Sequence, residues 1–206
     1  MAPRALEVVD AAGYGEGSGA AEPATAPAGT ADGDPTALGS AFHALAQWMV
    51  EMGASEVPIA RAEAQVRAWG VTPAQRERLD AMLARWGASA VRAEALSWPR
   101  VRAEVPFFSM GSTELAPRFG AFVEGAIDLL CDDPADPSRA LAIDYKTGGS
   151  ADEAPEALRE KHRLQAEVYA DVLHRAGYKQ VVLKFVRVEV PDSREPTEPQ
   201  VVTYEL

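Results

Sequence analysis

The chain has 206 residues, which is enough for one substantial domain with a flexible extension. Apolar residues make up 47% and charged residues 25%, which is ordinary for a soluble globular protein, and no continuous apolar stretch is long enough to span a membrane. The net charge of -11 argues against nonspecific DNA binding by the whole surface, because Lys and Arg grip phosphate backbones. The N-terminus lacks the pattern of a secretory signal, so we expect a cytoplasmic protein.

The chain contains a single cysteine, Cys131. One cysteine excludes an internal disulfide, an iron–sulfur cluster and a cysteine-rich zinc site made from this chain alone. We interpret Cys131 as a buried structural thiol.

The first 35 residues are predicted to be a disordered extension or linker. Residues 11–35 are rich in Ala, Gly, Pro and Thr and have almost no large apolar groups, so they cannot bury enough surface to offset the entropy of ordering. An apolar patch at residues 5–9 either docks as a strand or forms a loose end. The folded domain is expected to span residues 36–206.

The first half of that domain is predicted to be helical. Apolar residues recur at three- and four-residue steps across residues 38–52, with Thr36 as the expected cap. A second helix is expected at residues 59–69, and a third begins at Thr72 and Pro73 and runs to Trp86. Residues 88–96 suggest one more.

The pattern then changes to segments rich in Val, Ile, Phe and Tyr, which predict strands. A helix is expected at residues 155–176, ended by Gly177. The order of elements predicts an α+β fold, in which helices flank a mixed central sheet and the N-terminal half is helical. The expected strands cover residues 100–108, 121–131, 140–146, 181–190 and 201–206.

Candidate catalytic residues lie on two of these strands. Asp144 and Lys146 are two apart, so a strand presents both on one face. Asp128 precedes a turn-like segment, and a hairpin in the right register brings it near Asp144. Two carboxylates with a neutral imidazole suit Mg²⁺ or Mn²⁺.

Such a site suits phosphodiester hydrolysis, because a metal ion acidifies water and offsets negative charge on the phosphate. Lys146 can orient or deprotonate the water, or stabilise charge in the transition state, and the sequence leaves these roles open. Taken alone, an Asp-x-Lys triplet is common on solvated strand faces.

A wider set of motifs resembles the RecB-like PD-(D/E)XK nucleases, and most closely the C-terminal nuclease domain of AddA-type and RecB-type helicase-nucleases. The resemblance covers residues 38–206, and it rests on the order and spacing of five segments. These are residues 39–43, the AEVPF around Glu104, residues 125–128, the IDYKTG around Asp144, and Gln165 with Tyr169.

The resemblance implies a restriction-endonuclease-like fold and a role for each motif. His43, Asp128, Asp144 and the backbone carbonyl of Tyr145 match metal ligands, and Lys146 matches the catalytic lysine. Glu104 matches an acidic position near the site. Gln165 and Tyr169, one helical turn apart, match a pair that faces the active site and the DNA. Family members often carry an aromatic residue where this chain has His162.

Each residue also has a structural interpretation. His43 can be a hydrogen-bonded core histidine, Glu104 can pair with Arg100 or Arg102, and Gln165 and Tyr169 can simply cover the sheet. His162 and His174 are interpreted as surface groups.

The leading functional hypothesis is that the chain is a Mg²⁺-dependent deoxyribonuclease, and an exonuclease is expected. It would be the nuclease module of an ATP-dependent helicase-nuclease in double-strand-break repair and recombination. The sequence has no phosphate-loop motif, so a helicase module is expected elsewhere in a longer chain or in a partner subunit. The alternatives are a noncatalytic nucleic-acid-binding or structural module that retains the nuclease fold, and a hydrolase with another substrate.

Overall fold

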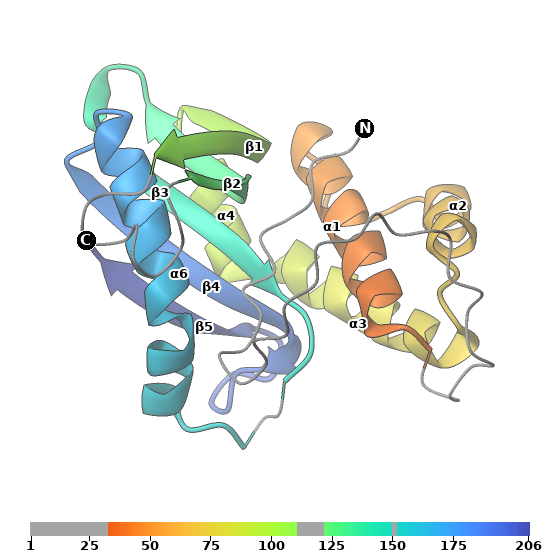
Figure 1. The fold of residues 1–206 in the computed structure, drawn as a ribbon. Coiled ribbons are helices and arrows are strands. Elements are labelled where there is room, and N and C mark those ends of the chain that lie inside the picture. The colour runs from red at the N-terminus through yellow and green to blue at the C-terminus, as the bar shows by residue number, and fades with distance from the viewer. Residues whose placement is uncertain (1–32, 111–121, 150–151) are drawn as a thin grey trace.

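The computed structural model describes residues 33–110, 122–149 and 152–206 (Figure 1). These residues build a five-stranded sheet in the order β1-β2-β3-β4-β5. Neighbouring strands are antiparallel, except that β4 runs parallel to β3. The predicted α+β fold with a mixed sheet is therefore confirmed. Most of the predicted linker, including the apolar patch at 5–9, lies outside the described residues.

The N-terminal half is helical, as predicted, and one helix begins earlier than expected. The first helix starts at Pro35, and its cap is Asp34, whose Oδ1 accepts a hydrogen bond from the Thr36 N–H at 2.9 Å. The prediction of Thr36 as the cap was wrong, because Pro35 takes the first helical position and places Thr36 inside the first turn. The helices are α1 (Pro35–Glu51), α2 (Ile59–Trp69), α3 (Pro73–Ala88) and α4 (Ala90–Leu96).

The start of α3 confirms its prediction. The Thr72 hydroxyl accepts from the Gln75 N–H at 3.3 Å, and the Gln75 side chain accepts from the Thr72 N–H at 3.0 Å. This reciprocal pair forms a capping box. None of the described helices is long and apolar enough to cross a membrane.

The strands of the sheet are longer than predicted at the turn between β2 and β3. Pairing continues to Asp133 and Asp136, so β3 begins four residues before the predicted start. Beyond α6, Gly177 has the positive φ of 107°, as expected of a glycine that ends a helix. The elements are β1 (Arg100–Met110), β2 (Phe122–Asp133), β3 (Asp136–Lys146), α6 (Pro155–Arg175), β4 (Gln180–Pro191) and β5 (Pro199–Glu205).

The sheet lies between two helical layers (Figure 1). Helix α6 covers one face, where Leu173 and Tyr169 pack against Leu183 and Phe185. Helices α1, α3 and α4 cover the other face, and its core includes Trp86. Both faces of the central strands are therefore buried. A polar side chain on these strands is unfavourable unless it forms a hydrogen bond or an ion pair.

Cys131 lies on β2 in the helical layer's core and is fully buried, as predicted. Burial raises the pKa of its thiol to about 12. The thiol therefore stays protonated at neutral pH and acts as a core group.

Candidate active site

Helix α1 carries His43 to the sheet. Phe42 is fully buried in the core, and His43 follows it at the margin of the buried face. One turn earlier, an added Cβ at Gly39 would lie 3.1 Å from the Oγ1 of Thr147, which follows β3. The absence of a side chain at Gly39 thus lets α1 approach the end of β3 closely.

Strands β1 and β2 both change face at the level of the site. Residues two apart on a regular strand share a face. Ala103, however, packs in the helical layer, whereas Val105 packs toward α6, and Leu129 and Ile127 divide in the same way. The residue between each pair therefore marks the reversal.

Those two residues are Glu104 and Asp128. The pairing of β1 with β2 omits them, because it passes from Ala103 with Leu129 directly to Val105 with Ile127. Glu104 has a φ of 49°, and it is the only non-glycine with positive φ in the described residues. An L residue in this region of backbone space costs on the order of 1 kcal/mol, and such strain clusters at functional sites.

Pairing between β2 and β3 stops next to Asp128. The last pair is Leu129 with Ile143, and one further step would set Asp128 opposite Asp144, as the predicted hairpin requires. Instead, the backbone N–H of Tyr145 donates to Asp128 Oδ2 at 2.6 Å. The Asp128 carboxylate therefore occupies the gap where the two strands separate.

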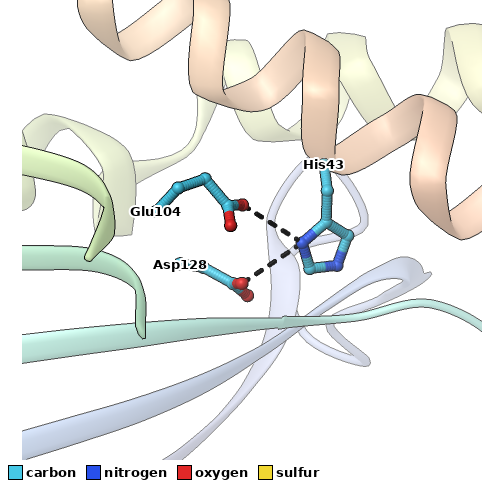
Figure 2. A group of neighbouring side chains, drawn as sticks. All are labelled: His43, Glu104 and Asp128. Carbon is cyan, nitrogen blue, oxygen red and sulfur yellow. Dashed lines mark ion pairs between the residues drawn. The ribbon is translucent and has the colours of Figure 1, made fainter. Parts of the chain in front are cut away.

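His43, Glu104 and Asp128 converge in this gap (Figure 2). The Nδ1 atom of His43 lies 3.2 Å from Asp128 Oδ1 and 3.8 Å from Glu104 Oε1. One ligand atom from each of the three lies within 4.8 Å of the others. We call these three residues the acidic cluster. Glu104 does not pair with Arg100 or Arg102, because both arginines contact Asp132.

The charges of the acidic cluster are coupled. Burial lowers the pKa of His43, but the charge and hydrogen bond of Asp128 and the hydrogen bond of Glu104 outweigh it and raise the pKa to about 10. Burial raises the pKa of Asp128, and the nearby charge of Asp144 raises it further, while His43 opposes both. The cluster therefore attracts positive charge, which a proton on His43 or a cation can supply.

Asp144 and Lys146 point to the α6 side of β3, as the alternation predicted, while Ile143 and Tyr145 pack in the helical layer. Lys146 Nζ lies 2.7 Å from Asp144 Oδ2 and donates to Gln165 Oε1 at 2.8 Å. The lysine ammonium is thus held at a fixed place beside the carboxylate.

Helix α6 holds the other oxygen of Asp144. Asp144 Oδ1 accepts from the Gln165 amide at 2.9 Å and from the Tyr169 hydroxyl at 2.8 Å. Burial and the charge of Asp144 raise the pKa of Tyr169, so its hydroxyl remains a donor. The expected helical pair therefore contacts Asp144 directly.

The profile of the PD-(D/E)XK nuclease superfamily matches residues 13–205 of the chain. The chain belongs to this superfamily. A comparison with curated proteins found no match. Membership implies a metal-dependent nuclease that acts on DNA, in agreement with this part of the leading hypothesis.

The acidic cluster of this PD-(D/E)XK chain fits a divalent cation. Oxygen ligands to Mg²⁺ lie at about 2.1 Å from the ion, so atoms on opposite sides of it are roughly 4.2 Å apart. The three ligand atoms lie within 4.8 Å of one another, which is close to that spacing. Glu104 therefore lies in the group that could hold metal, while Asp144 lies beside it and acts on Asp128 and His43 through its charge.

The structure corrects the interpretation of His162. It is partly buried and stacks on Phe185, with ring centroids 4.9 Å apart. Burial and the positive charge of Lys146 lower its pKa to about 4. His162 was expected at the surface because one histidine on a polar helix carries no sign of its packing partner on β4.

Glu189 was not predicted to support the site. Its Oε2 accepts from the Gly148 N–H at 2.8 Å, and its Oε1 pairs with Arg78 of α3. This carboxylate ties the loop after Lys146 to the helical layer. No sequence motif marks it, because β4 and α3 are distant in the chain.

Proposed function

We propose that this PD-(D/E)XK chain is a Mg²⁺-dependent deoxyribonuclease, with Mn²⁺ as a substitute. The observation that carries the proposal is the acidic cluster next to the Asp144–Lys146 pair. A carboxylate-rich centre and a fixed ammonium, side by side, are what phosphodiester hydrolysis requires.

The proposed ligands are His43, Asp128 and Asp144, with the carbonyl of Tyr145 and, from its position in the cluster, Glu104. A divalent cation bound by these residues would acidify water and offset negative charge on the phosphate. The Asp144 carboxylate is held by side-chain hydrogen bonds from Gln165 and Tyr169 and by the ion pair with Lys146.

Lys146 is the proposed catalytic lysine. Its contacts with Asp144 and Gln165 hold the ammonium where it can orient the attacking water and stabilise charge on the phosphate. Gln165 and Tyr169 are proposed to position Asp144 and Lys146 through these hydrogen bonds.

The finer proposal is that the chain is the nuclease module of an AddA-type or RecB-type helicase-nuclease, acts as an exonuclease and serves recombinational repair in the cytoplasm. The order and spacing of the five motifs support it. An ATP-driven helicase, in the same longer chain or in a partner subunit, would then supply unwound DNA. On this proposal, linear single-stranded DNA is cut, closed circles resist, and blunt duplex is cut only after a helicase unwinds it.

The decisive experiment is cleavage of linear single-stranded DNA with Mg²⁺ by the parent and by Lys146→Met. Loss of a positioned proton-transfer or charge-stabilising group should lower kcat by about 10²-fold or more. Lys179→Met, at an exposed lysine outside the site, is the matched control and should match the parent. Equal rates for Lys146→Met and the parent would refute the site, and metal binding without any cleavage would favour the noncatalytic module.

A further inference from the structure

Two exposed phenylalanines lie on the β1–β2 hairpin. Phe108 is 68% exposed and Phe122 is 60% exposed. Their rings stack, with centroids 5.7 Å apart and planes 20° from parallel. In the register, Phe108 pairs with Glu124 and Phe122 pairs with Met110, so the two rings are diagonal neighbours. We call Phe108 and Phe122 the aromatic pair.

The aromatic pair faces the same side of the sheet as α1. Phe107 packs on the α6 side, where its ring meets the Tyr169 ring edge-on at 5.8 Å. Since neighbours on a strand point to opposite faces, Phe108 points to the side of α1, from which His43 reaches Glu104.

The aromatic pair is also close to the acidic cluster along the strand. Phe108 follows Glu104 by four residues on β1, which is about 13 Å at ~3.3 Å per residue. Stacked nucleotides rise ~3.4 Å each, so about four of them cover this distance. A DNA strand in the site thus has bases within reach of the pair.

We propose that the aromatic pair is a stacking site for unpaired DNA bases next to the point of cleavage. The inference rests on the proposed function, because DNA is the occupant. Base faces stack on aromatic rings whatever the sequence, and a duplex hides these faces inside its own stack. The pair therefore favours single-stranded DNA.

The charge around the pair supports stacking over phosphate binding. Glu124 is exposed beside Phe108, and the chain carries a net charge of -11. Phosphates are repelled here, so the contribution to affinity must come from the bases. Affinity that depends on the pair should therefore add nothing to the salt dependence of binding.

The test is DNA binding without metal, which separates binding from cleavage. Phe108→Ala and Phe122→Ala should each weaken affinity for a single-stranded oligonucleotide by about tenfold and leave the salt slope unchanged. Phe108→Tyr and Phe122→Tyr, which keep a ring, should restore affinity. Trp69→Ala is the matched control, because Trp69 is 46% exposed on α2, away from the hairpin.

A second readout reports stacking itself. An oligonucleotide carrying 2-aminopurine should lose fluorescence on binding the parent and keep it on binding the Phe108→Ala/Phe122→Ala double variant. If the double variant binds the oligonucleotide and quenches its fluorescence as the parent does, the inference is overturned. It is also overturned if the two substitutions weaken the binding of capped duplex DNA as much as the binding of single-stranded DNA. If the parent stacks bases on the aromatic pair but does not cleave DNA, the proposed nuclease activity is contradicted and the stacking site is not. The two failures are therefore distinguishable.

Discussion

Strand β2 carries two buried aspartates in contrasting surroundings. Asp132 is 1% exposed and accepts hydrogen bonds from Arg100 Nε at 2.8 Å and from the Tyr178 hydroxyl at 3.0 Å. Asp128, four residues earlier, is 5% exposed, and its partners among the described residues are an imidazole and a backbone N–H. Asp132 is therefore paired with arginines, which are always charged, whereas the side-chain partner of Asp128 is a histidine.

The pKa shifts of the two aspartates are opposite. The hydrogen bond from Arg100 lowers the pKa of Asp132, whereas burial raises the pKa of Asp128. The same residue type on the same strand therefore stabilises the fold at one position and leaves a site for a cation at the other. Residue type and burial alone do not separate the two roles, but the surrounding charges do.

The largest expected effect is on catalysis at Asp128. Asp128→Asn keeps an acceptor for the Tyr145 N–H but removes the charge, so cleavage should fall by ~10³-fold, because several kcal/mol of metal-derived stabilisation is lost. Mn²⁺ binding by calorimetry should disappear as well.

Asp132→Asn is the matched control for that variant, and it should cut DNA at the parent rate while it remains folded. Unchanged Mn²⁺ affinity in Asp128→Asn would contradict the comparison.

The next effect is on stability at Asp132. Asp132→Asn breaks the ion pair with Arg100 and should lower the free energy of unfolding by about 2 kcal/mol in urea denaturation. Because the folded pKa lies below the unfolded value of 3.8, the contribution is complete above about pH 4 and is lost as pH falls further.

The stability gap between the parent and Asp132→Asn should thus be constant at pH 5 to 8 and narrow in acid. A gap that widens in acid would reverse the sign of this argument.

The smallest effect is expected at Glu104, which is partly exposed at the rim of the acidic cluster. Glu104→Gln should weaken Mn²⁺ affinity by about tenfold, the size of effect seen for supporting contacts to metal sites. Excess Mn²⁺ should restore cleavage, unlike in Asp128→Asn. Glu205→Gln, at an exposed glutamate on β5 outside both sites, is the control. Loss of cleavage that excess metal does not restore would make Glu104 indispensable, against this prediction.

Much of the fold followed from local patterns. Thr72 and Pro73 fixed the start of α3, and Gly177 marked the end of α6, because capping depends on a few neighbouring residues. The errors had local causes too. Pro35 moved the cap of α1 to Asp34, and pairing at the tight turn lengthened β3 beyond the predicted start.

The candidate site was predictable only in part. Strand alternation placed Asp144 beside Lys146, and helical spacing placed Gln165 with Tyr169. The resemblance implied that Glu104 lies near the site, but not that it joins His43 and Asp128 in a group that could hold a metal ion. That placement involves a residue with positive φ in the middle of a strand, which periodicity does not reveal.

The sequence by itself determined the order of helices and strands, the faces of β3 and α6, and the types of side chain available for chemistry, since these depend on short-range periodicity and residue identity. Only the tertiary structure decided which carboxylates lie close enough together to hold a cation. Asp128 and Asp132 look alike along the chain, and their difference arises from α1 and Glu104 at one end and from Arg100 and Tyr178 at the other. Electrostatic surroundings are set by residues distant in sequence, so they exist only once the chain has folded.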